Sequence, residues 1–245
     1  MPRTAREHSQ FGYIHVICRG INKQVLFEED RDYSFYLYLL EKYSRETGVA
    51  VNAYCLMDNH IHLLLCDLNR CVATMMKKIG VAYAGYFNRK YERTGHLFQG
   101  RFHSVPIENE IALKTVFRYI LQNPKKAGIC NVDEYRWSSY DQYGDDSSFV
   151  DTSALVHMIG DKAVYRELVG AEVEDEPRAL EMKKRDDEWA KAVLMRCLHV
   201  SNGMVLQTYD KTSRDKALHE LKKIGLTIRQ IERLTGINRG VVQRA

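Results

Sequence analysis

Two apolar segments rich in strand-forming side chains, residues 49–57 and 60–66, follow each other with only Asp58 and Asn59 between them. Asp and Asn favour tight turns, so this arrangement predicts two antiparallel strands joined at these residues. The remainder of the fold has to be built around that pair.

The flanking segments alternate between strand and helix patterns. The expected elements are strands at 13–19 and 102–107 and helices at 30–46, 70–93 and 109–122. The first helix should have Asp30 or Asp32 as its N-cap, and the third should end before Pro124, because the residue before proline is pushed out of the helical region. This order of elements predicts an α+β fold, an antiparallel sheet with helices on one face that resembles ferredoxin-like folds.

Charge divides the chain into three parts. Residues 1–136 hold 19 Lys and Arg against 14 Asp and Glu, residues 137–185 hold 6 against 11, and residues 186–245 hold 11 against 7. The two basic parts indicate modules that face a polyanion, although ordinary domains also carry such an excess. We expect a first domain at 1–143, an acidic connector with a short helix at 144–185, and a small all-α domain at 186–245.

Composition narrows the class of protein further. No stretch approaches the ~18 consecutive apolar residues that a membrane-spanning helix needs, and the N-terminus shows no apolar secretory segment. The six cysteines form no Cys-x-x-Cys pair and several lie in apolar runs, which indicates small buried side chains in a reducing compartment. We therefore expect a cytoplasmic globular protein.

The second strand of the predicted hairpin begins with two histidines, His60 and His62, on either side of Ile61. A strand places residues i and i+2 on the same face, so both imidazoles should project together. Histidine is the commonest metal-binding side chain, and two of them could form part of a divalent-metal site. The alternative is that both are polar residues on the solvated face of a strand.

Tyr119 and Asn123 lie four residues apart at the end of the helix expected at 109–122, so they share one face of it. A tyrosine phenol can act as a covalent nucleophile, and an amide oxygen is an acceptable ligand for Mg²⁺ or Mn²⁺. With His60 and His62 they could form a site for phosphodiester chemistry. The alternative for Tyr119, one of fifteen tyrosines, is ordinary packing.

Six segments resemble the single-tyrosine HUH transposases, and most closely the REP-associated tyrosine transposases, across residues 1–143. They are MPR at 1–3, YIHVICRGIN at 13–22, MDNHIHLLL at 57–65, GHLFQGRF at 95–102, RYILQNP at 118–124 and YRWSSY at 135–140. A His-x-His pair alone is a weak signal, whereas six segments in the family's order are specific.

This resemblance implies that Tyr119 attacks a DNA phosphate, giving a 5′-phosphotyrosine link and a free 3′-hydroxyl. It also implies that His60 and His62 bind the divalent metal, with Asn123 as the third ligand. Asp58 stands where many members have proline; it could hold a histidine ligand in place, bind the metal itself or only form the turn. Ile21 replaces an asparagine common in the family, which puts a polar role at that position in doubt.

Basic residues near these segments are candidates for DNA contacts. In the helix expected at 70–93, aromatic residues alternate with cations, a pattern typical of single-stranded DNA binding. The alternative is that the aromatic stripe packs on the sheet and the cations are solvated. The candidate residues are Arg3, Arg6, Lys77, Lys78, Arg89, Lys90, Arg101, Lys125 and Lys126.

Residues 226–244 have the pattern of a DNA-binding helix-turn-helix. Apolar residues define one face of a first helix, Gly236 permits the turn, and a second helix begins at Arg239. Arg239, Gln243 and Arg244 would then face the major groove. The alternative is a helical packing or dimerisation module, because Glu232 occupies a position where this motif usually has a small residue.

Two functions from different classes follow. The first is a transposase-like enzyme that uses a divalent metal to cleave and rejoin single-stranded or hairpin DNA. The second is a regulator that binds DNA with the same fold but without chemistry. A rolling-circle replication or mobilisation nickase would share the chemistry, but the family spacing and the small catalytic module disfavour it. Monomer and homodimer both remain open.

Overall fold

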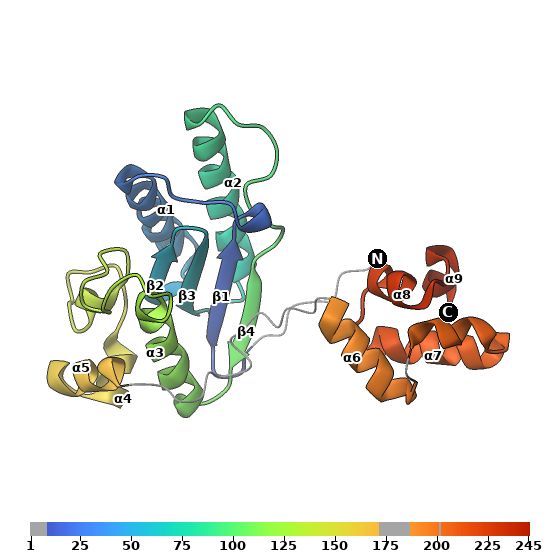
Figure 1. Cartoon of the computed structure of the whole chain (residues 1–245). Coiled ribbons are helices and arrows are strands. Elements are labelled where there is room, and N and C mark those ends of the chain that lie inside the picture. Colours follow the sequence, from blue (N-terminus) through green and yellow to red (C-terminus); the bar gives the residue numbers. More distant parts are fainter. Residues whose placement is uncertain (1–8, 172–186, 201) are drawn as a thin grey trace. The chain divides into compact units, whose positions relative to one another are not determined.

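The hairpin joined at Asp58 and Asn59 is part of a four-stranded antiparallel sheet in a computed structural model that describes residues 9–171, 187–200 and 202–245 (Figure 1). The strands are β1 (Tyr13–Arg19), β2 (Ala50–Met57), β3 (His60–Cys66) and β4 (His103–Ile107). Their order is β2-β3-β1-β4, and every neighbouring pair is antiparallel. The predicted α+β class with an antiparallel sheet is confirmed. Contacts within the chain form two units, residues 1–180 and 181–245.

Two crossover helices cover one face of the sheet. α1 (Asp30–Thr47) follows β1 and the short 3-10 helix η1 (Ile21–Lys23), and α2 (Val72–Lys90) connects β3 to β4. Tyr36 of α1 and Tyr83 and Phe87 of α2 are completely buried in the core that these helices form with the sheet. Much of the aromatic stripe of α2 is therefore core packing.

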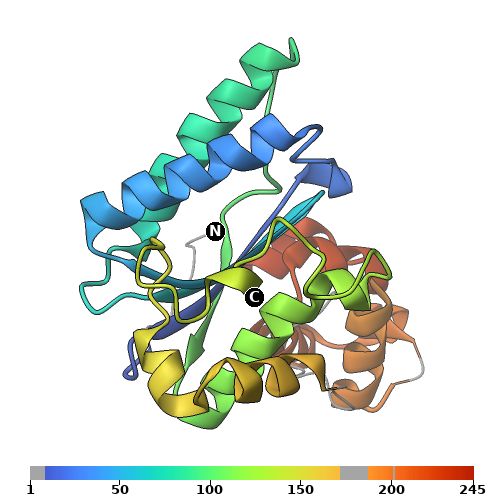
Figure 2. The same cartoon turned by 90° about the vertical axis from the view of Figure 1, so that its left-hand side faces the viewer.

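A third helix covers the opposite face. α3 (Glu110–Lys126) lies on the other side of the sheet from α1 and α2 (Figure 2). Its residues Leu113, Phe117 and Leu121 belong to a second buried cluster with Leu64 of β3. The sequence led us to expect helices on one face only, which holds for α1 and α2 but not for α3. Cover on both faces is required because the side chains of β1, β2 and β3 are buried along almost their entire length.

The start of α1 is tied to the end of α2 by a buried carboxylate. The N-cap of α1 is Glu29, rather than Asp30 or Asp32, and Asp32 completes a capping box with it. The Asp32 side chain, 0% exposed, accepts hydrogen bonds from Lys90 (2.5 Å), Tyr91 (2.7 Å) and Tyr86 (2.9 Å). Asp32 is thus a connection between two helices and not only a cap.

α3 continues through Pro124, although the sequence predicted that it would end before this residue. Proline lacks the N–H that would bond the carbonyl of Ile120. The Asn123 side chain replaces it, because its Nδ2 donates to the oxygens of Ile120 (3.3 Å) and Tyr119 (2.8 Å). The local rule failed because a side chain satisfied the orphaned carbonyl.

Residues 138–171 belong to the first unit, where Ser138 and Val150 form isolated bridges with Cys55 and Val51 of β2. The elements are η2 (Tyr140–Gln142), α4 (Ser153–Ile159) and α5 (Lys162–Gly170). Where we expected one short helix there are two, because Gly160, at φ 112°, ends α4 and the Asp161 side chain caps α5. Tyr165 of α5 packs against Phe117 of α3. The domain limits at residues 143 and 185 stay a prediction.

The second unit is helical in the part that the structure describes. Its elements are α6 (Asp187–Leu198), η3 (Gly203–Thr208), α7 (Lys211–Ile224), α8 (Ile228–Thr235) and α9 (Arg239–Arg244). Leu194, Leu218 and Ile231 lie in its buried core. Between α8 and α9, Gly236 adopts φ 67°. Within the described residues, every helix is too short or too polar to cross a membrane.

Candidate functional site

His60 and His62 project from the face of the sheet that α3 covers. In the register of β1 and β3, His60 lies opposite Arg19 and His62 lies opposite Ile17. The centroids of the two imidazole rings are 5.0 Å apart and the ring planes meet at 83°. The strand geometry therefore brings the two rings together at one end of β3, as the i, i+2 spacing requires.

Asn59 fixes the protonation of His60. Its Oδ1 lies 2.8 Å from Nδ1 of His60, and because an amide oxygen can only accept, Nδ1 carries the proton and donates. Burial and the charge of Arg19 lower the pKa of His60 to about 4, opposed by a hydrogen bond with Asn123 and the charge of Asp58. At neutral pH the ring is uncharged, with its lone pair on Nε2.

His62 is enclosed, with 1% of its surface exposed, and its partner is another histidine. Nδ1 of His62 lies 3.0 Å from Nε2 of His15 on β1, and the two rings stack at 18°. Burial is the main cause that lowers the pKa of both rings, that of His15 to about 3. Both imidazoles are therefore neutral.

α3 places Tyr119 against these histidines. Its ring centroid is 5.6 Å from that of His62 and 6.0 Å from that of His15, with edge-to-face geometry in both pairs. Nζ of Lys126 lies 4.7 Å from the centroid of the same ring. Asn123, one turn after Tyr119, is 8% exposed and lies within reach of His60, where it favours the charged form of that ring. The structure thus brings together the four residues singled out in the sequence.

The donor set of this cluster fits a divalent cation. The two imidazoles are neutral and each has its Nδ1 in a hydrogen bond, so each can offer its Nε2 to a cation. The amide side chain of Asn123 adds an oxygen ligand. In the described part of the chain, no three His, Cys, Asp or Glu side chains come together in a metal-holding group. The candidate set is His60, His62 and Asn123, and a cation there would complete its shell with water or phosphate oxygens.

Asp58 forms the turn between β2 and β3, and residues outside this hairpin donate hydrogen bonds to it. Its carboxylate accepts a hydrogen bond from the hydroxyl of Tyr33 (2.9 Å), and its backbone oxygen accepts from the amide of Leu26 (2.6 Å). Its negative charge also opposes the lowering of the pKa of His60 that burial and Arg19 cause. These contacts favour the turn interpretation, with an electrostatic effect on His60 in addition.

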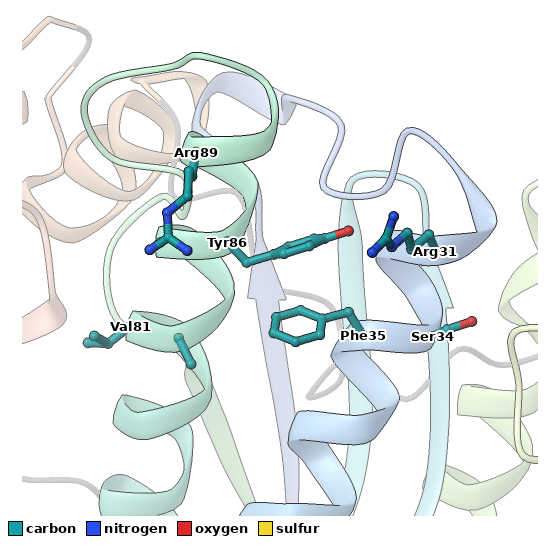
Figure 3. Close-up of a pocket in the computed structure, with 8 residues that line it drawn as sticks. Arg31, Ser34, Phe35, Val81, Tyr86 and Arg89 are labelled. Carbon is teal, nitrogen blue, oxygen red and sulfur yellow. The ribbon is translucent and has the colours of Figure 1, made fainter.

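The candidate DNA-binding cations of α2 lie on the other face of the sheet. Lys78 pairs with Glu46, and Lys90 pairs with Glu29 and Asp32. Lys77 is exposed. A groove of about 710 Å³ is lined by residues of α1 and α2 (Figure 3). Its labelled lining residues are Arg31, Ser34, Phe35, Val81, Tyr86 and Arg89. These cations are thus separated from Tyr119 by the sheet.

Other candidate cations lie nearer the histidines. Lys125 and Lys126 are exposed and directly follow Pro124, the residue after Asn123. Arg101 is exposed two residues before His103, which pairs with Ile17 at the end of β1 that carries Arg19.

In the second unit, the α9 residues Arg239, Gln243 and Arg244 are exposed. Arg3 and Arg6 lie outside the described residues.

Sequence reasoning missed two members of the cluster. His15 and Arg19 belong to the first strand and were read only as parts of a strand pattern. Their spacing from each other and from Tyr13 is even, which places all three on one face. That they face His60 and His62 follows from the register of β1 on β3, which the local pattern does not contain.

Comparison with known proteins finds a matching family model and a solved structure with the same fold. Residues 9–123 match the family model described as "Transposase IS200 like". The structure of a REP-associated tyrosine transposase bound to a REP hairpin matches with a TM-score of 0.51 and 17% identity, over 58% of this chain and 85% of that chain.

A structure from Deinococcus radiodurans R1, described as a candidate transposase, matches with a TM-score of 0.34 and 20% identity, over 44% of this chain and 87% of that one. No curated protein matches the sequence. Residues 9–123, just under half of the chain, thus match the model of the IS200-like transposase family, and the likeness to the hairpin-bound structure shows that the fold is shared.

Proposed function

We propose that this chain cuts and rejoins single-stranded DNA, with Tyr119 as the nucleophile and a 5′-phosphotyrosine intermediate. The observation that carries the proposal is the position of the Tyr119 ring, 5.6 Å from the ring of His62, which itself lies 5.0 Å from His60. In this arrangement a nucleophile and a cation-binding pair can act on one phosphate.

The reaction exchanges one phosphodiester for another. Oη of Tyr119 forms a bond to phosphorus while the bond from phosphorus to O3′ breaks. The phenol loses its proton and the departing oxygen gains one, which releases a 3′-hydroxyl. A second DNA 3′-hydroxyl then attacks the tyrosyl phosphate and restores the phenol. The number of ester bonds is unchanged, so strand joining needs no external energy source.

His60, His62 and Asn123 would hold a divalent cation, Mg²⁺ or Mn²⁺. When bound, the cation would supply positive charge that polarises a phosphoryl oxygen. Asn123 commits its nitrogen to the backbone of α3, which leaves its oxygen for this role. Lys126, beside the Tyr119 ring, can pair with a phosphate oxygen.

Hairpin DNA is the substrate that we infer. The solved relative with the same fold is bound to a REP hairpin, and Arg101 and Lys125 offer exposed charges near the candidate site. In the second unit, α8 and α9 would act as a helix-turn-helix, with Arg239 and Arg244 directed at duplex DNA. Replacing both arginines by Ala should weaken binding to duplex DNA, whereas unchanged affinity would favour a packing module.

The test is a covalent adduct. Labelled hairpin DNA, the full-length protein and Mn²⁺ should give a product that survives SDS. Tyr119→Phe should abolish it with hairpin binding retained, and His60→Ala should do the same. Tyr38→Phe is the control, because this exposed tyrosine lies on α1, across the sheet. Hairpin binding without any wild-type adduct would contradict the proposal and favour the DNA-binding regulator.

A further inference from the structure

His15 is buried against His62 and has no second hydrogen-bond partner in the described part of the chain. Its side chain is 0% exposed, its Nε2 lies 3.0 Å from Nδ1 of His62, and its own Nδ1 is buried without a partner there. A core histidine with a purely structural role usually satisfies both nitrogens, because an unpaired buried polar atom is costly. Within the described residues, the hydrogen-bonding partner of the His15 ring is therefore His62.

The sheet enforces this contact. His15 lies opposite Leu64 and His62 lies opposite Ile17, so the two histidines are diagonal neighbours on one face. Their ring centroids are 5.2 Å apart and the planes are nearly parallel. Since β1 and β3 are both buried here, neither ring can turn towards solvent. The geometry is a property of the strand register.

His60 provides the comparison. Its Nδ1–H donates to the amide oxygen of Asn59, which leaves the Nε2 lone pair for a cation. Histidines that bind metals usually donate their other N–H to an acceptor in this way, which sets the tautomer and raises the basicity of the ligand. At His62 the group in that position is His15. Of the two ways to place the shared proton, only donation from His62 leaves Nε2 of His62 free.

We propose that His15 is a positioning residue that accepts the Nδ1–H of His62 and holds this ring in the tautomer that binds a divalent cation through Nε2. The inference rests on the proposed metal-dependent function. His15 is not itself a ligand, because its Nε2 accepts from His62 and its Nδ1 then carries the proton. Its edge-to-face contact with Tyr119 means that the same ring also packs against the nucleophile.

The first test measures Mn²⁺ binding to the full-length protein without DNA, from the electron paramagnetic resonance signal of the free ion. His15→Leu removes the acceptor, and affinity for Mn²⁺ should fall about 10–100-fold. His15→Gln returns an amide oxygen to this position and should restore most of the affinity. Leu64→Val alters the packing directly opposite His15 and should bind Mn²⁺ like wild type. Wild-type affinity in His15→Leu, or equal loss in the Leu and Gln variants, would overturn the inference.

The second test uses the wild-type protein, so its result does not depend on whether a variant folds. A ¹⁵N–¹H correlation spectrum of the wild-type protein with Mg²⁺ should show the proton of His62 on Nδ1, and a proton on Nε2 would overturn the inference. His62→Ala separates the two levels of the account. If it binds Mn²⁺ as wild type does, the proposed metal site is wrong, whereas His62-dependent binding that is insensitive to His15 overturns this inference alone.

Discussion

The side-chain nitrogen of Asn123 donates a hydrogen bond of 2.8 Å to the backbone oxygen of Tyr119, one turn earlier in α3. The same nitrogen reaches the oxygen of Ile120, which Pro124 leaves without a partner. Asn123 also lies within reach of His60. One side chain thus stabilises the turn that carries Tyr119 and belongs to the candidate metal site.

Substitution of Asn123 separates these two roles. Asn123→Asp keeps an oxygen ligand but cannot donate, so the free energy of unfolding should fall by about 1–3 kcal/mol while Mn²⁺ binding is retained. Asn123→Ala should lose both. Urea denaturation and Mn²⁺ titration measure the two effects. An Asp variant that binds Mn²⁺ as poorly as the Ala variant would exclude the ligand role.

Asp32 predicts a pH-dependent contribution to stability. Burial alone would raise the pKa of Asp32, but the hydrogen bonds that it accepts, first from Lys90 and then from Tyr91, lower it. Such a carboxylate stabilises the fold above its unfolded pKa of about 3.9, and this stabilisation is lost as the pH falls through the lower folded value. Asp32→Asn should therefore cost about 3 kcal/mol at pH 7 and progressively less below pH ~4.

Urea unfolding of wild type and Asp32→Asn across this pH range measures the difference. Asp30→Asn is the control on the same turn, because the Asp30 carboxylate is exposed and forms a surface ion pair with Arg136. It should cost less than about 1 kcal/mol at pH 7. A pH-independent cost of Asp32→Asn would show that the charge of this carboxylate is not what stabilises the contact between α1 and α2.

Glu232 has a structural role that its helix-turn-helix position did not suggest. Its Oε1 accepts a hydrogen bond of 3.0 Å from the backbone N–H of Arg239, at the start of α9. Glu232→Ala should destabilise the second unit by about 1 kcal/mol, the usual effect of losing a cap. Thermal unfolding followed in the full chain tests this, with exposed Glu220→Ala as control. Equal midpoints for both variants would contradict the capping role.

The sequence was sufficient for features that depend on neighbouring residues. The hairpin turn, the strand face shared by His60 and His62, and the helix that carries Tyr119 follow from local periodicity. The family resemblance rested on the same short segments. By contrast, the predicted end of α3 was wrong, because the rule that a helix stops before proline takes no account of the hydrogen bonds that the Asn123 side chain donates to the backbone.

Features that depend on packing could not be predicted in this way. His15 is 47 residues from His62, and the register that joins them is set by the whole sheet. The cations Lys78 and Lys90 looked free in the sequence, but α1 brings acidic partners to both. The sequence analysis did not predict that α3 covers the second face of the sheet, although strands that are apolar on both faces require helices on both sides.

The most direct test of the central claim locates the DNA on the protein. After reaction with hairpin DNA and Mn²⁺, trypsin should release residues 119–125, between Arg118 and Lys126, as a peptide whose single tyrosine is Tyr119. Mass spectrometry should find this peptide joined to the 5′-phosphate of a nucleotide. DNA attached to any other tyrosine, or through a 3′-phosphate, would contradict the account.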